Sequence, residues 1–359
     1  MLNVGILTSG GDCQALNAAM RGVVLSLFEK TQNIKIFGFE DGFKGLIYKK
    51  YRQLFQEDFE TILDEGGTIL GSSREPFKHI TEITSEGIDK VQSMIETYKD
   101  LKLDCLVILG GNGTHKTANL LLSEKGLNVV TLPKTIDNDI YGTDMTFGFQ
   151  TAVGIATKII RYIQSTAKSH SRIFIVEVMG HKTGWLTLHA GIASGADVIL
   201  LPEIPYNIEK ITERLKSNEA NGKKYAIIAV AEGAYSSELA ELSKKERKLK
   251  LSQTGFPSAA YRVASELQAA MPEKETRVQI IGHCQRGGEP CAYDKVLASR
   301  VGTAAACYIL EKKFGVMAGI TNGKIVPVPL NEVAGKLKKI SSDDQLVQQA
   351  KTLGICLGI

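Results

Sequence analysis

The sequence lacks any long hydrophobic run. No apolar stretch among its 359 residues reaches the ~18 residues that a membrane-spanning helix needs, so we expect no membrane span. The first residues, MLNVGILTSGGD, show neither the basic region nor the cleavage site of a secretory signal, and are typical of a strand followed by a turn. Internal repeats and low-complexity tracts are also lacking.

Cysteines with the spacing of a metal or redox site are lacking as well. The six cysteines include no CxxC pair, and several lie in apolar or small-residue runs. This pattern favours free thiols over disulfides and indicates a cytoplasmic protein. The formal net charge of +4 is too weak to indicate a nucleic-acid partner, although clustered basic residues can still bind small anions.

Glycine, by contrast, is abundant, and short runs rich in valine and isoleucine alternate with helical patterns. The 35 glycines indicate many tight turns or close approaches of backbone to ligand. The alternation predicts an α/β fold, with parallel sheets covered by helices on both faces, and the length predicts two domains. The predicted strands are 3–7, 34–39, 105–109, 129–132, 173–178, 198–201, 226–231 and 278–281. The predicted helices include 17–28, 85–98, 115–122 and 149–166. The polar segment 235–272, which contains the basic stretch LSKKERKLKL, predicts a solvated surface excursion rather than a binding patch.

Glycine-rich turns follow two predicted strands. The stretches ILTSGGDCQALNAAMRG (6–22) and CLVILGGNGTHKTANLL (105–121) each run from a strand through glycines into a helix start. Exposed amides and a helix N-terminus make an anion site, although a tight strand–helix turn uses glycine anyway. Two such turns can face one crevice, and together they favour a polyphosphate ligand. GGTILGSSREPF (66–77) adds a third turn with Arg74, which can fork onto phosphate or form a surface salt bridge.

Two carboxylates, Asp137 and Asp139, follow a predicted strand in LPKTIDNDIYGTD (132–144). A turn can aim carboxylates at this spacing at different groups. Phosphoryl transfer needs a carboxylate that accepts the proton of the attacking hydroxyl and charge that holds Mg²⁺ on the phosphates. From composition alone, a plain turn made by Asp and Asn is the alternative.

Basic and polar residues also flank the later predicted strands. They are Arg172, Met179, Gly180, His181, Glu232, Arg277, His283 and Arg286. Three arginines and a histidine could clamp a sugar phosphate. Each of these residues alone is more often part of a salt bridge or an ordinary surface residue.

These motifs, in this order, strongly resemble the phosphofructokinase family. The matching stretches are GILTSGGD, GGTILGSSR, GGNGT, PKTIDND, TFGFQTA, SHSRIFIVEVMG, GIASGADVILLPE, GHCQRGGEP and YDKVLASRVGTAA. The resemblance implies two stacked three-layer α/β domains with mostly parallel sheets and an active site in the cleft between them. It implies a phosphoryl-donor domain of 1–148 plus 285–335. The sugar-phosphate domain would be 149–284 plus 336–359, with a polar insertion at about 235–272.

The resemblance also implies the reaction and its residues. A phosphoryl group would pass to the 1-hydroxyl of fructose 6-phosphate, giving fructose 1,6-bisphosphate, a step of glycolysis. Asp137 would be the base, and Thr135, Gly11 and Lys134 would lie beside the transferring group. Asp139, with Asn112, would hold Mg²⁺. The implied donor residues are Gly11, Arg74, Gly111, Asn112, Gly113 and Thr114. The implied sugar-phosphate residues are Thr135, Asp137, Asp139, Arg172, Met179, Gly180, His181, Glu232, Arg277, His283 and Arg286. Arg172 and Arg277 match arginines that reach in from a neighbouring subunit, which implies a homodimer or homotetramer.

The sequence departs from the family pattern at several positions, among them Asn112, His181, Phe43 and Glu75. Asn112 replaces an aspartate that helps to position Mg²⁺; an amide oxygen can still bind a metal but brings no charge. His181 stands where compact members have an arginine that stabilises the transition state. Phe43 and Glu75 replace two aromatics that flank the nucleotide, and Glu75 cannot stack.

The phosphoryl donor remains open between ATP and pyrophosphate. In pyrophosphate users, an aspartate stands at the position of Gly113 and a lysine at that of Lys134. A carboxylate at 113 would crowd and repel the α-phosphate of ATP, whereas glycine leaves room for it; the lysine suits pyrophosphate. We favour ATP, because the absence of a carboxylate that would exclude ATP is a stronger argument than the presence of a lysine that suits pyrophosphate. A non-catalytic sugar-phosphate-binding regulatory subunit is the minor alternative, and another ketose phosphate is a further possible acceptor.

Overall fold

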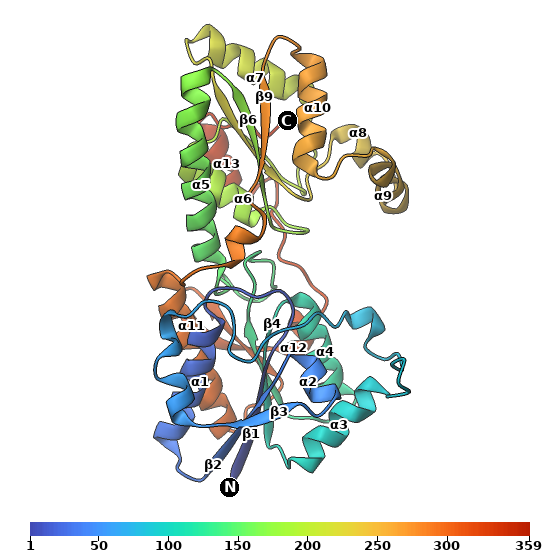
Figure 1. Cartoon of the computed structure of the whole chain (residues 1–359), viewed down its shortest axis with the longest axis vertical. Helices are drawn as coiled ribbons and strands as arrows, with labels where there is room; N and C mark the ends of the chain where they lie inside the picture. Colours follow the sequence, from blue (N-terminus) through green and yellow to red (C-terminus); the bar gives the residue numbers. More distant parts are fainter. The chain divides into compact units, whose positions relative to one another are not determined.

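The computed structural model describes all 359 residues, which form two compact units (Figure 1). Unit 1 contains Met1–Thr151 and Arg286–Lys338, and unit 2 contains Ala152–Gln285 and Lys339–Ile359. Each unit is therefore assembled from two separate stretches of chain. These bounds differ by only a few residues from the domain bounds in the sequence analysis, while the ligand assigned to each domain stays a prediction.

Unit 1 is built on a seven-stranded sheet with the strand order β11-β10-β5-β4-β1-β2-β3. The five inner strands run parallel, and the two edge strands, β3 and β11, are antiparallel to their neighbours. The strands are β1 (Leu2–Thr8), β2 (Ile34–Phe39), β3 (Tyr51–Leu54), β4 (Cys105–Gly110), β5 (Val129–Pro133), β10 (Val316–Thr321) and β11 (Lys324–Pro329). All residues of β4 and β5 are buried, as expected for parallel strands covered on both faces.

Helices cover both faces of this sheet. On one face, α1 (Leu16–Lys30) packs against α11 (Ala292–Leu310), where Gly22 and Gly302 let the two backbones approach closely. The other face carries α2 (Phe43–Ile47), α3 (Lys90–Asp100), α4 (Asn112–Ser123) and α12 (Leu330–Val333) (Figure 1). The whole chain also contains four short 3₁₀ helices: η1 (Gln56–Phe59), η2 (Ile62–Asp64), η3 (Phe77–His79) and η4 (Gly282–Arg286).

Unit 2 is built on a four-stranded, fully parallel sheet with the order β7-β8-β6-β9. Its strands are β6 (Ile173–Val178), β7 (Val198–Leu200), β8 (Ala226–Ala231) and β9 (Thr276–Ile280). Its helices are α5 (Phe149–His170), α6 (Trp185–Ser194), α7 (Ile208–Ala220), α8 (Ser237–Ala240), α9 (Lys244–Gln253), α10 (Ala259–Ala270) and α13 (Gln345–Thr352). A hydrophobic cluster joins α7 and α10 to the sheet through Ile211, Leu215, Val263 and Leu267.

The predicted α/β fold with mostly parallel sheets is confirmed, and every predicted strand is present. Strands β3, β10 and β11 were not predicted. Their sequences, YRQL, VMAGIT and KIVPVP, are polar, small-residue or proline-containing, so they carry weak strand signals. The helix predicted over 85–98 begins later, at Lys90, because Asp89 caps it by accepting a hydrogen bond from the Gln92 N–H.

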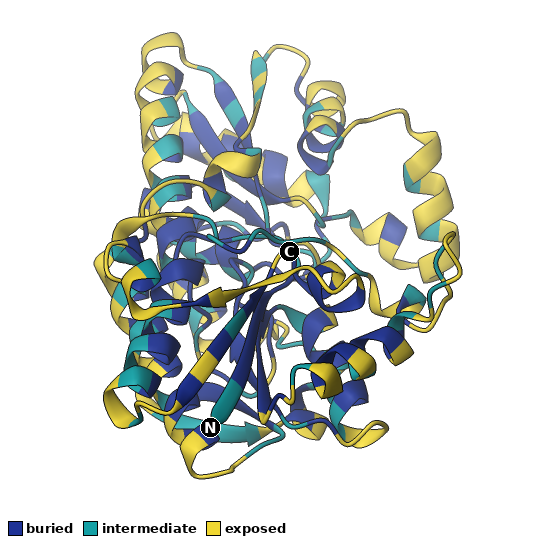
Figure 2. Ribbon diagram, turned by 60° about the horizontal axis from the view of Figure 1, so that its bottom comes forward, coloured by how far each residue is buried: buried dark blue, intermediate teal, exposed yellow.

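The polar segment 235–272 divides into two parts. Helix α9 has no buried residue and is largely exposed (Figure 2), as predicted. The prediction of a surface excursion is wrong for α10, which buries Ala259, Ala260, Val263 and Leu267. These four residues form a narrow apolar stripe in AAYRVASELQAA, and the polar residues between them mask it in a composition count.

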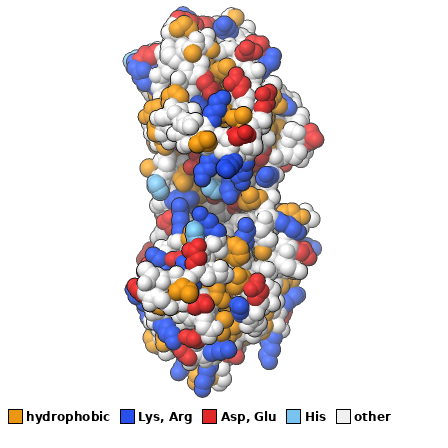
Figure 3. Space-filling view, turned by 90° about the vertical axis from the view of Figure 1, so that its right-hand side faces the viewer, with side chains coloured by type: hydrophobic (Ala, Val, Ile, Leu, Met, Phe, Trp, Pro, Cys, Tyr) orange, Lys and Arg blue, Asp and Glu red, His pale blue; other side chains and the backbone are white.

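Neither unit contains a helix both long and apolar enough to cross a membrane. Acidic and basic side chains both occur on the visible face of each unit, and Lys and Arg side chains gather toward one end of each (Figure 3).

Candidate active site

The first glycine turn follows β1 at the carboxyl edge of the unit 1 sheet. Gly10 has a φ of +88°, a conformation that glycine adopts without strain. Its N–H donates to the Ser73 carbonyl at 3.0 Å, and its carbonyl accepts from the Ser72 hydroxyl at 2.7 Å. These bonds fasten the turn to the 66–77 segment and place Arg74 next to it. No carboxylate lies within ion-pair distance of the exposed Arg74 side chain, so the salt-bridge alternative is wrong.

The two positions expected beside a nucleotide base form no aromatic wall. Phe43 is only 1% exposed and belongs to the hydrophobic core of unit 1. Glu75 forms an ion pair with Lys90 at 3.2 Å. Neither side chain can stack on an adenine in this arrangement.

The second glycine turn follows β4, the neighbour of β1. Gly111 precedes α4, whose first-turn amides at Asn112, Gly113 and Thr114 have no acceptor inside the helix. A side chain at Gly113 would meet no atom within 4 Å, so the space beside it is open. The registered pair Thr8–Leu109 and a hydrogen bond of 2.9 Å from Ser9 N to Leu109 O bring the two turns side by side. Their amides can therefore share one anionic ligand.

Lys134, which follows β5, connects the two turns. Its side chain is 2% exposed, and its ammonium donates to the Gly11 carbonyl. Its backbone N–H donates to the Gly110 carbonyl at 3.1 Å. Burial lowers the pKa of Lys134 to about 8, and the positive charge of Arg286 acts in the same direction. A buried ammonium between two anion-binding turns would be stabilised by a bound polyanion.

Arg286 also lies at this edge of unit 1. Its Nη1 donates to the Asp12 carbonyl at 2.9 Å, and a side chain at Gly11 would come within 2.8 Å of that nitrogen. Gly11 is therefore needed to make room for the guanidinium. The Arg286 Nε is buried with no hydrogen-bond partner. Arg286 was predicted among the sugar-phosphate residues; in the structure it lies beside the glycine turns predicted to bind the donor.

The two carboxylates lie on a turn with fixed geometry. Asn138, between them, has a φ of +52°, which asparagine tolerates better than most residues. The Asn138 Oδ1 accepts from the Thr146 N–H at 3.1 Å and from the Lys338 ammonium at 3.0 Å. The Asp137 N–H donates to the Thr135 hydroxyl at 3.1 Å. Asp137 is half-buried and Asp139 only 7% exposed, so the turn gives the two carboxylates different environments.

The environment of Asp139 favours its protonated form. Burial raises the pKa of Asp139 to about 6, and repulsion by Asp137 adds to the shift. Lys338 and Lys134 act in the opposite direction. The folded protein therefore holds this proton more tightly than the unfolded chain does, and the charged carboxylate destabilises the fold as the pH rises from about 4 to about 6.

We expect Asp139→Asn to stabilise the protein at pH 7.5 with chelator present, by up to about 3 kcal/mol. The gain in Tm should shrink as the pH falls from 7.5 to 5, because the wild-type carboxylate then becomes protonated. Thermal unfolding at both pH values measures the effect. Asp144→Asn, which changes an exposed carboxylate of the same loop, is the control. A gain in Tm that does not depend on pH, or no gain, would contradict the view that the charged Asp139 carboxylate destabilises the fold.

Residues 336–338 form hydrogen bonds with both the second glycine turn and the acidic turn. These contacts were not predicted from the sequence. The Asn112 Nδ2 donates to the Lys336 carbonyl, and the Lys338 N–H donates to the Asp139 carbonyl at 2.9 Å. The Lys338 ammonium also donates to the carbonyls of Thr143 at 3.0 Å and Asp144 at 2.9 Å. A carboxylate cannot donate a hydrogen bond, so an aspartate at 112 could not make this contact. The amide at this position therefore has a structural role.

The unit 1 site offers few metal ligands. The structure contains no group of three or more His, Cys, Asp or Glu side chains placed to hold a metal ion. Mg²⁺ does not need such a group, because it commonly binds one or two carboxylates together with water and substrate phosphates. The Asp139 carboxylate fits a metal of this kind.

In unit 2, the carboxyl ends of β6 and β8 bring a second set of predicted residues together. The Glu232 Oε1 accepts from the N–H groups of Gly180 at 3.3 Å and His181 at 2.6 Å. Gly180 has a φ of +149°, and a side chain there would come within 2.5 Å of the Thr183 carbonyl. Only glycine fits this position.

Gln285, which the sequence analysis missed, ties the β9 end of the sheet to this group. Its Oε1 accepts from the Met179 N–H at 3.2 Å, and it lies in η4 two residues after His283. Met179, Gly180, His181, Glu232 and His283 therefore lie at one edge of the sheet. Gln285 is fully buried in GHCQRGGEP, where the flanking histidine and arginine carry the more obvious signal.

Arg172 and Arg277 lie at the opposite edge of the same sheet. Arg172 precedes β6, and its Nε donates to Glu275 at 2.7 Å; Arg277 pairs with the same carboxylate. The hydrogen bond from Arg172 lowers the pKa of Glu275. The length of β6 separates this ion-pair group from Met179 by roughly 20 Å at about 3.3 Å per residue. The structure therefore does not bring the two arginines to the other sugar-phosphate candidates of their own unit.

The arrangement of glycine turns and acidic turn matches a known family. Residues 3–309 match the phosphofructokinase family model. The chain belongs to the phosphofructokinase family. The resemblance of the motifs is thus confirmed, and phosphofructokinases are phosphotransferases that use an alcohol acceptor.

The matches to two similar proteins cover almost the whole chain. The ATP-dependent 6-phosphofructokinase of Spirochaeta thermophila is 51% identical, with 99% of this chain and 97% of that protein covered. The ATP-dependent 6-phosphofructokinase of Propionibacterium freudenreichii is 44% identical, with 99% of each covered. The solved phosphofructokinase of Saccharomyces cerevisiae is 32% identical with a TM-score of 0.77; the match covers 92% of this chain and 45% of the yeast chain. This chain thus spans less than half of the yeast phosphofructokinase chain.

Proposed function

We propose that this protein is a 6-phosphofructokinase that transfers a phosphoryl group from ATP to the 1-hydroxyl of fructose 6-phosphate, in glycolysis. The observation that carries the proposal is the acidic turn of Asp137 and Asp139, fixed beside two glycine turns that Lys134 joins. The names of the two bacterial relatives support both the reaction and the donor. Six free thiols suit a cytoplasmic enzyme.

The residues of unit 1 have distinct roles in the proposed transfer. Asp137, the more accessible of the two carboxylates, accepts the proton of the attacking hydroxyl. The amides of Gly11, Gly113 and Thr114 and the ammonium of Lys134 stabilise the charge on the transferring group and on the donor phosphates. Thr135 fixes the base, because its hydroxyl accepts from the Asp137 N–H. Arg286 and Arg74 supply further positive charge at the same edge.

Mg²⁺ is the expected metal. Asp139 would hold it, and the Asn112 amide oxygen is a second candidate, since its nitrogen is bound to Lys336. When bound, Mg²⁺ neutralises charge on the donor phosphates. Metal binding would also relieve the electrostatic strain at Asp139, since a cation favours the ionised carboxylate.

Unit 2 supplies the proposed sugar-phosphate site. One oxygen of Glu232 fixes the Met179–His181 turn, and its other oxygen, Oε2, forms no hydrogen bond within the chain and can accept from a sugar hydroxyl. Met179, Gly180, His181 and His283 would surround the sugar phosphate. An arginine is always charged, so a histidine at 181 would supply less transition-state charge than the arginine of the compact members.

The open space beside Gly113 supports ATP rather than pyrophosphate, because the α-phosphate of ATP needs room there. A coupled assay with fructose 6-phosphate and either donor tests the proposal. We expect turnover with ATP. Turnover with pyrophosphate alone would contradict the donor but keep the acceptor. Binding of fructose 6-phosphate with no turnover would instead support a regulatory subunit.

We also propose that Arg172 and Arg277 act in the active site of a neighbouring subunit of a homodimer or homotetramer. Their location at the edge opposite Glu232 supports this arrangement. Each would bind sugar phosphate through charge-assisted hydrogen bonds, so Arg172→Ala should raise KM for fructose 6-phosphate about 10–100-fold.

A subunit-mixing experiment tests this arrangement. Arg172→Ala and Asp137→Ser subunits are co-expressed with different tags, and the mixed oligomer is purified and assayed at low fructose 6-phosphate. The purified mixed pair should show about half of the wild-type activity, because one of its two sites regains both residues. In the control, the Asp137→Ser subunit is paired instead with a Lys216→Ala subunit, in which an exposed residue of α7 is replaced. Activity no higher than the sum of the two separate variants would contradict the shared site.

A further inference from the structure

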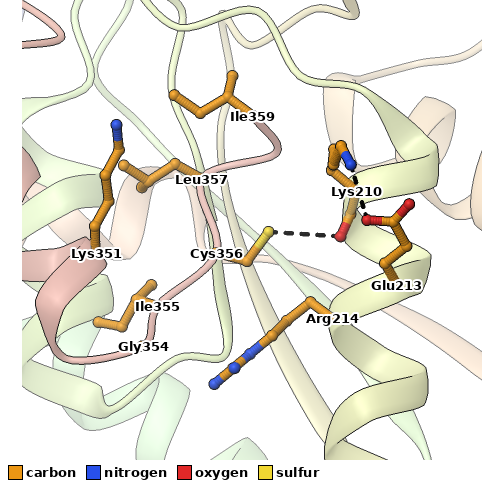
Figure 4. A pocket seen from close by; sticks show the side chains of 9 residues that line it. All are labelled: Lys210, Glu213, Arg214, Lys351, Gly354, Ile355, Cys356, Leu357 and Ile359. Carbon is orange, nitrogen blue, oxygen red and sulfur yellow. Dashed lines mark hydrogen bonds and ion pairs between the residues drawn. The ribbon is translucent and has the colours of Figure 1, made fainter.

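The charged side chains not yet assigned a role differ in whether their contacts converge. The pocket beside α7 has a volume of about 620 Å³, but its Arg214 and Lys351 side chains extend to opposite sides of it (Figure 4). Lys210, in the same pocket, already forms an ion pair with Glu213 at 3.0 Å. These cations therefore form no common anion site. The contacts of Lys338, by contrast, converge on the acidic turn.

The Lys338 ammonium binds three oxygens of one loop. It donates to the Asn138 Oδ1 at 3.0 Å, to the Thr143 carbonyl at 3.0 Å and to the Asp144 carbonyl at 2.9 Å. An ammonium has three N–H donors, so these acceptors can occupy all of them. Lys338 therefore acts on the loop itself rather than on a ligand.

Two of these oxygens belong to residues that are fastened to the sheet of unit 1. The Asp144 N–H donates to the carbonyl of Ile320, in β10, at 2.8 Å. The Ile320 N–H donates to the Thr143 hydroxyl at 3.0 Å. Lys338 thus ties the acidic turn, through Thr143 and Asp144, to a buried strand.

The third oxygen belongs to the residue at the centre of the acidic turn. Asn138 lies between Asp137 and Asp139, and its φ of +52° is a conformation that costs free energy in most residues with a side chain. Lys338 and the Thr146 N–H both donate to its Oδ1. The Lys338 N–H donates in addition to the Asp139 carbonyl at 2.9 Å. Lys338 therefore holds the turn through both its side chain and its backbone.

Burial of the Lys338 ammonium costs free energy. It lowers the pKa of Lys338 to about 8, whereas Asp144 and Asp139 act in the opposite direction. Replacing a buried charge with an apolar side chain of similar size is often neutral or stabilising. The geometry that the ammonium gives to the turn therefore explains its presence better than a gain in stability does.

The backbone on both sides of Lys338 is held in place. Leu337 forms an isolated β-bridge with Ile140, and the Ile340 N–H donates to the Glu203 Oε1 at 3.3 Å. Because the segment is fixed at these points, the Lys338 side chain approaches the turn from a defined direction.

We propose that Lys338 is a positioning residue for phosphoryl transfer, which sets the orientation of Asp137 and Asp139 by holding Asn138 and residues 143–144. This role rests on the proposed function, because it concerns the same acidic turn. It requires no contact between Lys338 and the substrate.

Lys338→Met keeps the length of the side chain and the backbone N–H, and removes the ammonium. We expect kcat with ATP to fall about 10–100-fold, since misplacing catalytic groups by roughly 1 Å can cost about 10²-fold. Direct binding of fructose 6-phosphate, measured by calorimetry, should change little, because its proposed contacts lie mainly in unit 2. Lys99→Met, which removes an exposed lysine of α3, is the control and should leave kcat unchanged.

Return of the ammonium distinguishes positioning from a general packing defect. In Lys338→Cys, the thiolate displaces bromide from 2-bromoethylamine, and the new carbon–sulfur bond carries an ammonium at nearly the length of lysine. This alkylation, verified at position 338 by peptide mass spectrometry, should restore most of the lost kcat. Iodoacetamide, which adds a neutral amide, should not restore it. Wild-type protein treated in the same way accounts for the six native cysteines.

Hydrogen exchange tests the turn without reference to turnover. Lys338→Met should speed amide exchange in peptides that span 135–147 and leave those of α3 unchanged. Unaltered exchange over 135–147, unaltered kcat, or a loss of kcat that aminoethylation does not restore would each overturn the positioning role. No turnover by the wild type, together with faster exchange in Lys338→Met, would overturn the proposed function alone.

Discussion

Replacing Asp137 with serine should reduce kcat by about 10²–10⁴-fold while KM for fructose 6-phosphate changes little. Serine cannot accept the hydroxyl proton at neutral pH, so the transition state loses its base. The substrate contacts proposed for unit 2 should be unaffected, because they involve other residues. Asp137 takes part in the turn mainly through its N–H, which bonds Thr135 at 3.1 Å, and serine retains that N–H. The fold should therefore be preserved.

Steady-state kinetics with ATP, together with direct binding of fructose 6-phosphate, distinguish this result from a folding defect. Asp137→Asn keeps the shape of the side chain and should be similarly impaired. Asp144→Asn, on the same loop, should keep most of its activity, since Asp144 accepts a hydrogen bond at 2.7 Å from the Asn322 N–H that an amide oxygen can also accept. If Asp137→Ser kept a tenth or more of the wild-type kcat, Asp137 would not be the base.

Replacing Gly113 with aspartate should reduce kcat/KM for ATP by about 10²–10³-fold. The new carboxylate would enter the space left for the donor and repel its phosphates at short range. The substitution should leave the fold intact, because a side chain there meets no atom within 4 Å and Gly113 is not among the glycines with positive φ. Few positions in the site separate function from stability so clearly.

Two measurements support the interpretation of Gly113→Asp. Gly113→Ala adds volume without charge and should cost much less activity than aspartate if repulsion dominates. Activity with pyrophosphate, which has no α-phosphate to be excluded, should fall less than activity with ATP or rise. Unchanged kcat/KM for ATP in Gly113→Asp would show that the donor does not pass this loop.

Local patterns account for most of the fold and part of the site. Valine- and isoleucine-rich runs identify buried strands, and the residues after those strands identify the edges where ligands bind. Gly11, Gly113 and Asp137 could be found in this way. The Lys338 and Gln285 contacts could not, because each joins residues far apart in the chain and no local pattern precedes it. The structural role of the Asn112 amide could not be predicted either, since its partner is the backbone carbonyl of Lys336, which is far away in the sequence.

The position of a residue along its strand also carries information that a motif does not. Arg172 and Glu232 both follow the family pattern, yet one precedes its strand and the other follows it. In a parallel sheet this difference puts the two side chains at opposite edges. Motif order alone assigns both to one site, whereas strand direction separates them.

The discontinuous course of unit 1 has a consequence for the order of events during synthesis. Strand β5, which carries Lys134 and the acidic turn, has β4 on one side and β10 on the other. Until the ribosome has made β10, β5 is a bare edge that can pair with another chain. The turn itself receives Lys338 about 200 residues after Asn138 has emerged. The nascent chain therefore completes this turn only after Lys338 has been made, and chaperone protection of the β5 edge would matter most in the preceding interval.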